Sequence, residues 1–225
     1  MKIACIGDSL GMPRENVLYE DTWFFRVQQS HPEKMFISCF QRSLTTDMLL
    51  DNFDEYSFIK PDYLILQLGI CDCAPRLIND KSFFWSYVIK FARVFRCLPL
   101  FWKFIKRFFK RKPSRVYVPI KRFKSNLSLF MEKTISRMNV KKIIIIKICT
   151  PGTAATSSSP YMVSNIIKYN AIFDELAAVY PKLIEIINPL SDGDDRYYVD
   201  GYHPNKEGFT RVANDLQEII TTFES

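Results

Sequence analysis

Five short apolar segments, separated by longer segments with helical spacing, constrain the fold of this chain more than any other feature. Short apolar runs bounded by turn residues indicate buried strands, and strands that alternate with helices predict right-handed crossovers and a parallel sheet. The expected fold is therefore a three-layer α/β/α sandwich with a five-stranded parallel sheet. The expected strands lie at 2–6, 35–40, 62–68, 142–149 and 183–187, and the helical segments at roughly 20–30, 44–53, 83–98, 120–138, 163–180 and 205–222.

Length and composition predict one domain over residues 1–225. A chain of 225 residues with 48% hydrophobic content can build one substantial core but is short for two. The six cysteines form no C-x-x-C pair, and the chain begins directly with a strand rather than with a basic and apolar leader. These features favour reduced thiols and a cytoplasmic protein. No run of about 18 uncharged apolar residues is present, so we expect no membrane-spanning helix.

Charge is distributed unevenly along the chain. The formal net charge is +7, but residues 81–124 contain 14 Lys and Arg and no Asp or Glu. The same segment contains 13 of the aromatic residues. Such a local asymmetry indicates an interaction surface added to an otherwise mildly acidic domain. We therefore expect a basic aromatic helical insertion at about 81–118.

The insertion is expected to form two amphipathic stripes. One runs through residues 83–98, and a second follows Pro99 and ends by Pro113. Aromatic stripes backed only by cations fit an anionic membrane surface, which residues 83–112 would contact from the cytoplasmic side. Packing onto the domain or onto a second subunit of a homo-oligomer is the alternative. Nucleic acid is disfavoured, because the aromatics follow a helical stripe rather than a stacking platform.

A serine stands at the tip of the first strand. The apolar run at 2–6 gives way to Gly7-Asp8-Ser9, and in parallel α/β sheets ligands bind at the carboxyl ends of strands. A serine becomes a nucleophile when a base takes its proton and a third group orients that base. Taken alone, Ser9 is equally a turn or capping residue. The segment at 153–160, rich in Ser, Thr and Ala, is expected to be a mobile loop at the same edge.

Only two histidines are available as the base. His31, followed by Pro32, is expected in a solvated loop. His203 follows Asp200 by three residues, just before the last helical segment. Asp200-Gly201 alone could be a turn, but Ser9, His203 and Asp200 together supply nucleophile, base and orienting acid.

Gly7-Asp8-Ser9-Leu10 near the start, combined with Asp200-x-x-His203 near the end, resembles the SGNH or GDSL hydrolase family of esterases and lipases. The resemblance implies a flavodoxin-like sheet. It also implies that Ser9 is the nucleophile, His203 the base and Asp200 its orienting acid. No cofactor and no metal are implied, and the closely spaced pair of Cys71 and Cys73 lacks further metal ligands.

The sequence departs from the family at the oxyanion hole. In the family this hole combines the N–H of the nucleophile, the N–H of a glycine after the second strand, and an asparagine in a G-x-N-D stretch. Here Ser9 keeps the first position, Ser43 stands at that of the glycine, and Cys71 at that of the asparagine. A thiol is a weak donor, so the contribution of Cys71 is doubtful, and the loss of one donor typically costs about 10²- to 10³-fold in rate.

Gly69-Ile70-Cys71-Asp72-Cys73-Ala74-Pro75-Arg76 and Gly11-Met12-Pro13-Arg14 resemble a subgroup of SGNH proteins met among bacterial polysaccharide-biosynthesis genes. By this resemblance the expected substrate-binding residues are Asp8, Arg14, Asp72 and Arg76. An arginine could replace the missing donor or bind an anionic sugar or phosphate. An Arg–Asp pair that joins two loops is the structural alternative.

The function expected from these patterns is that of a serine esterase. Its substrate would be a small acyl ester, with acetyl favoured, on a bacterial surface glycan or its lipid-linked precursor. An O-acyltransferase with the same covalent serine is one alternative. A catalytically weak glycan-binding or membrane-associated scaffold protein is another, kept open by Cys71.

Overall fold

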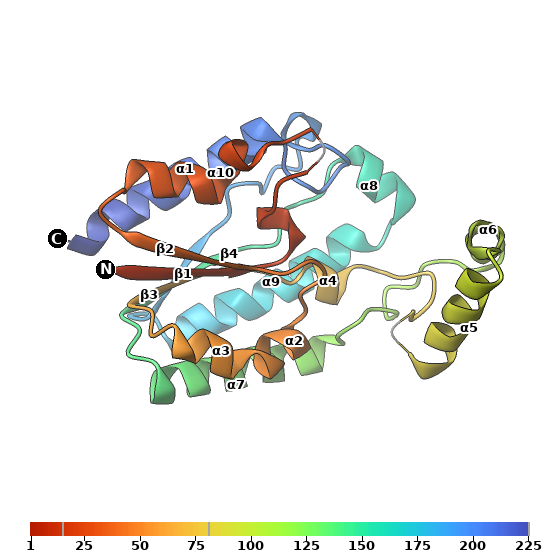
Figure 1. Cartoon of the computed structure of the whole chain (residues 1–225), viewed down its shortest axis with the longest axis horizontal. Coiled ribbons are helices and arrows are strands. Elements are labelled where there is room, and N and C mark those ends of the chain that lie inside the picture. Colours follow the sequence, from red (N-terminus) through yellow and green to blue (C-terminus); the bar gives the residue numbers. More distant parts are fainter. Residues whose placement is uncertain (15, 81, 225) are drawn as a thin grey trace.

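A five-stranded parallel sheet lies at the centre of the computed structural model, which describes residues 1–14, 16–80 and 82–224. The strand order is β2-β1-β3-β4-β5 (Figure 1), which is the flavodoxin-like order. This confirms the α/β fold class and all five expected strands. The strands are β1 (Lys2–Gly7), β2 (Met35–Phe40), β3 (Tyr63–Gln67), β4 (Lys142–Ile146) and β5 (Ile184–Ile187).

Helices cover both faces of the sheet. The first and last helices, α1 and α10, pack together on one face, whereas α2, α3, α7 and α9 cover the other (Figure 1). Apolar residues on both sides of the strands are buried in this way, including Ile143 to Ile146 of β4. These helices are α1 (Trp23–Ser30), α2 (Thr46–Asp51), α3 (Phe53–Phe58), α7 (Ile120–Arg137), α9 (Met162–Val179) and α10 (Lys206–Thr221).

The chain order places a topological switch point beside β1. From β1 the chain crosses to β2 on one side and then returns to β3 on the other. Gly7, the last residue of β1, is paired with Phe40 and with Gln67, so the carboxyl ends of the three strands lie side by side. In open α/β sheets ligands bind at this crevice.

Gln67 locks the end of β3 into the core. Its backbone carbonyl accepts a hydrogen bond from the N–H of Asp8 at 2.9 Å. Its side-chain oxygen accepts another from the buried indole N–H of Trp23 at 2.7 Å. Because buried polar groups cost free energy unless they are hydrogen-bonded, these contacts fix the turn after β1 relative to β3 and α1.

The basic insertion forms a helical hairpin that projects beyond the carboxyl edge of the sheet. It consists of α5 (Phe83–Val94) and α6 (Leu98–Phe108), and it stands apart from the sandwich at the right of Figure 1. Residue 81, where the sequence analysis begins the insertion, lies outside the described residues. Backbone hydrogen bonds fix its base, including that from the N–H of Arg76 to the carbonyl of Arg115 at 2.7 Å.

Four of the elements expected from the sequence need correction. The strand expected at 142–149 ends at Ile146. The helical segment expected at 44–53 is two short helices, α2 and α3, that meet at Asn52. The helix expected at 83–98 ends at Val94, and a turn precedes α6. The loop expected at 153–160 contains helix α8 (Thr153–Ser158). Asp195 explains this helix, because its carboxylate accepts hydrogen bonds from the N–H and the hydroxyl of Thr153.

Candidate active site

Ser9 lies at the carboxyl end of β1, on a sharp turn that the sequence makes possible locally. Gly7 allows a close approach of chains, since a Cβ there would lie 2.7 Å from the ring of Phe40 and 2.9 Å from the carbonyl of Gln67. Asp8 then accepts a hydrogen bond from the N–H of Leu10 and begins a short 3-10 helix over Ser9–Gly11. The turn leaves the hydroxyl of Ser9 at the edge of a pocket.

A second loop, before α10, carries the histidine. Asp200 accepts a hydrogen bond from the backbone N–H of His203 at 3.0 Å. Gly201 has φ of +91°, and a Cβ there would lie 2.7 Å from the backbone N of Ala155, so the turn requires glycine. Asn205 caps α10 through the N–H groups of its first turn. His31, the other histidine, lies at the end of α1 and does not line this pocket.

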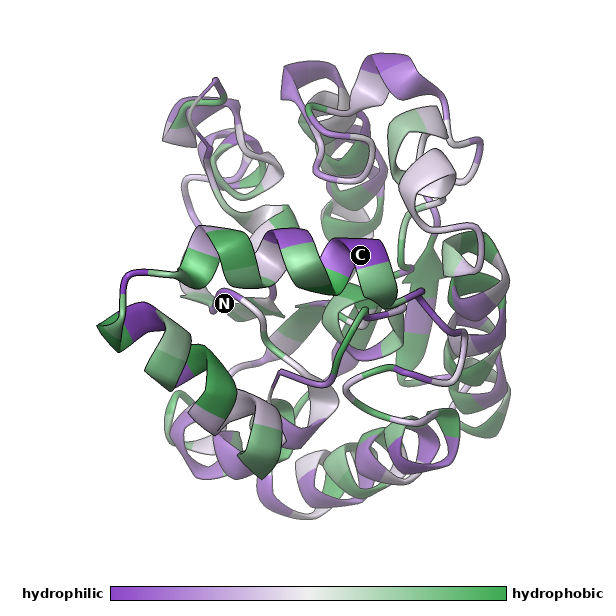
Figure 2. Ribbon diagram, turned by 90° about the vertical axis from the view of Figure 1, so that its right-hand side faces the viewer, coloured by the Kyte–Doolittle hydropathy of each residue, from purple (hydrophilic) through white to green (hydrophobic). Residues whose placement is uncertain are grey.

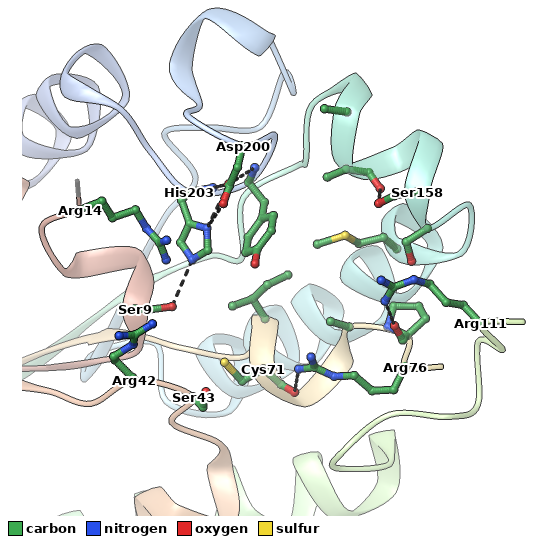
Figure 3. A pocket seen from close by; sticks show the side chains of 18 residues that line it. Ser9, Arg14, Arg42, Ser43, Cys71, Arg76, Arg111, Ser158, Asp200 and His203 are labelled. Atoms are coloured by element: carbon green, nitrogen blue, oxygen red, sulfur yellow. Dashed lines mark hydrogen bonds and ion pairs between the residues drawn. The ribbon is translucent and has the colours of Figure 1, made fainter. Parts of the chain in front are cut away.

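Ser9, His203 and Asp200 form a continuous hydrogen-bonded chain (Figure 3). Nε2 of His203 lies 3.2 Å from Oγ of Ser9, and Nδ1 lies 2.8 Å from Oδ2 of Asp200. An ionised carboxylate only accepts hydrogen bonds, so Nδ1 carries the proton and Nε2 is free to accept one from Ser9. The structure thus brings together the three residues that the sequence analysis singled out, and in an order that suits proton transfer.

The surroundings keep His203 neutral. Burial is the main cause that lowers the pKa of His203 to about 4, and the cations of Arg14 and Arg42 act in the same direction against the opposing effect of Asp200. Burial alone would raise the pKa of Asp200, but the hydrogen bonds from His203 outweigh it and hold this pKa below its usual value. The pair is therefore a neutral imidazole oriented by a carboxylate, which is the form required of a general base.

The segments that carry Ser43 and Cys71 line the pocket together with Ser9, as expected for an oxyanion hole. Ser43 has φ of +60°, the left-handed conformation in which glycine is favoured. The backbone N–H groups of Ser9 and Ser43 donate to no acceptor among the described residues. Cys71 lies on α4 (Ile70–Cys73) and also lines the pocket. Ser9, Ser43 and Cys71 therefore line the same pocket.

The pocket beside Ser9 has a volume of about 420 Å³, which suits a ligand of sugar size. Arg14 and Arg76 line it, as expected for substrate-binding residues. Arg42 and Arg111 line it as well, and the sequence analysis missed both. Arg42 directly precedes Ser43 and could have been found from that position, whereas Arg111 belongs to a run of cations in which no single residue stands out.

Asp8 and Asp72 do not fit the substrate-binding role expected from the sequence. Both side chains are fully buried beneath the pocket rather than in its lining. Asp72 lies in α4, and its Oδ1 accepts hydrogen bonds from the N–H and the hydroxyl of Thr46 at 2.8 and 2.6 Å. Burial raises the pKa of each carboxyl to about 7. Both residues support the turns that carry the site.

Comparison of the sequence with family models and with curated proteins gives no match. Solved structures are similar in fold over nearly the whole chain. A member of the lipolytic G-D-S-L family from Veillonella parvula is 14% identical, with 98% of each chain covered and a TM-score of 0.63. The psychrotrophic esterase EstA from Pseudoalteromonas sp. is 16% identical, with 99% of this chain and 97% of that chain covered and a TM-score of 0.63.

The acetylxylan esterase Axe2 from Geobacillus stearothermophilus resembles this chain about as closely as those two proteins do. It is 14% identical, with 96% of this chain and 92% of that chain covered and a TM-score of 0.61. These likenesses confirm that the chain has the SGNH α/β/α sandwich fold of the GDSL proteins. The resemblance stated from the two sequence motifs is thereby confirmed at the level of the fold.

The low pKa of His203 predicts an unusual pH dependence for any reaction that needs this base. His203 accepts a proton only when neutral, so kcat/KM should stay constant down to about pH 5 and fall to half near its pKa of about 4. The double variant Arg14→Gln/Arg42→Gln removes two charges that disfavour the imidazolium, so its midpoint should rise. The measurement is the pH profile of ester hydrolysis, with circular dichroism at each pH. A wild-type midpoint at or above the ordinary value of about 6.5 contradicts the prediction.

Proposed function

We propose that the protein is a serine esterase that removes a small acyl group, with acetyl favoured, from a bacterial surface glycan or its precursor. The observation that carries the proposal is the hydrogen-bonded chain Ser9–His203–Asp200 at the mouth of an open pocket. Support for an acetylated glycan comes from Axe2, a protein of the same fold that is an acetylxylan esterase. An O-acyltransferase uses the same covalent serine, and it differs only in the acceptor of the acyl group.

The proposed reaction proceeds in two halves. Oγ of Ser9 attacks the ester carbonyl while Nε2 of His203 takes its proton, and the tetrahedral intermediate collapses to an acyl-serine. His203 returns the proton to the oxygen of the departing alcohol. A water molecule, deprotonated by the same imidazole, then attacks the acyl-serine. The bond between the acyl group and Oγ breaks, His203 returns the proton to Oγ of Ser9, and the acid is released. Asp200 holds the imidazole in the required tautomer throughout.

In this mechanism the backbone N–H groups of Ser9 and Ser43 stabilise the oxyanion. The third position holds the thiol of Cys71, which donates weakly. A preorganised donor is usually worth about 10²- to 10³-fold in rate. We therefore expect modest turnover of simple esters that lack any additional binding group.

The first test of the proposal is the nucleophile itself. Ser9→Ala and His203→Ala should each lower kcat for p-nitrophenyl acetate by at least about 10³-fold, because each removes a group that takes part in bond making or proton transfer. Asp200→Ala should lower kcat by less, because Asp200 only orients the base. A fluorophosphonate probe should label wild type at Ser9 and fail to label Ser9→Ala. Ser164→Ala, an exposed serine of α9, is the matched control. Full turnover by Ser9→Ala would refute the assignment of the nucleophile.

The weak third donor gives a second test. Cys71→Asn introduces an amide at the position where the family has one, so kcat for p-nitrophenyl acetate should rise by about tenfold or more. Cys71→Ala removes the thiol without adding a donor and should not raise kcat. If Cys71→Asn has an unchanged or lower kcat than wild type, another group already completes the hole, and the account of a weak hole is wrong.

We further propose that the helical hairpin, α5 with α6, holds the enzyme on the cytoplasmic face of an anionic membrane. Only Ala92 and Ile105 are buried in these two helices. Large apolar side chains on its outside are exposed, among them Phe84, Phe91 and Phe108 at 65, 64 and 63%. Figure 2 shows the hairpin from the side on which it projects, with its apolar and polar stretches along both helices.

Charge decides which partner fits this surface best. Residues 83–112 contain nine Lys and Arg and no acid, and a Lys or Arg near an anionic bilayer contributes about 1 kcal/mol of binding. Within the described part of the chain, no helix has the length and apolar character needed to cross a bilayer. The proposed mode is therefore interfacial: aromatics enter the headgroup boundary while cations face the lipid phosphates.

Vesicle flotation tests the docking. Wild type should float with anionic vesicles far more than with neutral ones, binding should weaken with salt, and aromatic insertion should leave a salt-resistant remainder. Phe84→Ser/Phe91→Ser/Phe108→Ser should lose that remainder. Phe58→Ser is the matched control, because Phe58 is 85% exposed on α3, outside the hairpin.

Two results contradict the docking proposal. One is equal partition onto anionic and neutral vesicles, and the other is partition onto neither. A stable dimer that the triple variant loses would assign the same surface to a subunit interface instead.

A further inference from the structure

Four arginines converge on the candidate active site from four separate parts of the chain. Figure 3 shows two of them, Arg14 and Arg42, beside Ser9 and His203, and the other two, Arg76 and Arg111, across the pocket. Arg14 follows the turn that carries Ser9, Arg42 follows β2, Arg76 follows α4 and Arg111 follows α6. Cations so distant in sequence that meet in one cavity indicate a ligand that requires positive charge.

None of the four guanidinium groups is neutralised by an ion pair with the described residues. Asp200 is the only acid among the described residues that line the pocket, and it is hydrogen-bonded to His203. Nε of Arg14 and Nε of Arg76 are both buried without a hydrogen-bond partner. The pocket therefore holds an excess of positive charge with unused donors.

Among the described residues, only neutral groups hold the pair across the pocket, Arg76 and Arg111, in position. Arg76 stacks over the ring of Tyr117, with 4.1 Å between the guanidinium carbon and the ring centroid, and donates to the carbonyl of Cys71 at 3.3 Å. Arg111 donates to the carbonyl of Pro75 at 2.6 Å. Each contact orients a guanidinium and adds no negative charge, and each of the two hydrogen bonds uses one of the five donors of its guanidinium.

The two cations also repel each other. Burial lowers the pKa of Arg111, and the nearby charge of Arg76 lowers it further. A structural role alone would be served as well by one cation or by a neutral side chain. A ligand anion between the two groups would turn the repulsion into attraction and would accept charge-assisted, bidentate hydrogen bonds.

We propose that Arg76 and Arg111 form an anion subsite, so that the ester substrate carries a phosphate or a carboxylate on its sugar. The inference rests on the proposed esterase function for the identity of the reacting group. With the ester at Ser9 and the anion at Arg76 and Arg111, the substrate spans a pocket of about 420 Å³, which is room for roughly one sugar ring. Arg14 and Arg42 lie next to the reacting ester.

Three matched esters test the subsite with the full chain. They are a mono-acetylated methyl glucoside, its 6-phosphate, and the corresponding glucuronide. For wild type, kcat/KM of at least one anionic ester should exceed that of the neutral ester by tenfold or more, and the preferred anion distinguishes phosphate from carboxylate. In Arg76→Gln/Arg111→Gln this ratio should fall about tenfold. Lys121→Gln/Lys182→Gln removes the same charge from exposed positions outside the pocket and should keep the ratio.

Arg111→Gln alone is the second variant, because it leaves the stack of Arg76 on Tyr117 intact. Arg111→Gln should lower the ratio of kcat/KM between the anionic and neutral esters, but by less than the double variant does. Calorimetry with Ser9→Ala provides a readout that needs no turnover. The 6-phosphate ester should bind to Ser9→Ala more tightly than the neutral ester, and this preference should shrink with added salt. The preference should be lost in Ser9→Ala/Arg76→Gln/Arg111→Gln.

The outcomes separate the two proposals. One outcome is hydrolysis of the neutral ester with kcat/KM about equal for the anionic and neutral esters, both in wild type and in the arginine variants. This outcome overturns the anion subsite and leaves the esterase proposal standing. Preferential binding of the anionic ester without hydrolysis of any ester and without probe labelling overturns the esterase proposal and supports the subsite. If the protein shows no preference for the anionic ester and hydrolyses no ester, both proposals are overturned.

Discussion

The pairing of β1 with both β2 and β3 is the constraint on which the site depends. Gly7 is in register with Phe40 and Gln67, so the segments that follow the three strands must leave the sheet at one edge. Ser9, Ser43 and Cys71 therefore line the same pocket although they lie far apart in the sequence. The buried hydrogen bonds of Gln67 to Asp8 and Trp23 keep this edge in place. A register shift by one residue would turn every strand side chain to the opposite face and disperse the site.

Electrostatics beneath and around the pocket follow from the same arrangement. Burial works against charge on His203, Asp8 and Asp72 alike, and it moves the pKa of the histidine down and those of the two carboxyls up. The pocket itself keeps its charge, because guanidinium groups lose a proton far less readily than carboxyls or imidazole. The result is a neutral base surrounded by permanent cations. This combination suits a reaction in which negative charge develops on the substrate.

The sequence predicted the sheet and the serine, histidine and aspartate, because strand periodicity and short motifs are local signals. It failed where an outcome depends on tertiary contacts. Asp72 was expected among the substrate-binding residues, but hydrogen bonds from Thr46, which lies 26 residues away, hold it inside the protein. Helix α8 depends on Asp195, which no local pattern reveals. Arg111 could not be singled out among its neighbours, since its place in the pocket depends on a contact with Pro75.

The hairpin has a consequence for the stability of the molecule. Its helices contribute only Ala92 and Ile105 as buried residues, and neither belongs to the hydrophobic core of the sandwich. Because local stability follows buried apolar contact, the hairpin can open while the sandwich stays folded. Its amides should exchange with solvent through this local opening. Arg111, three residues beyond α6, lies at the boundary between the two cooperative units, so order in the hairpin and order at that side of the pocket are coupled.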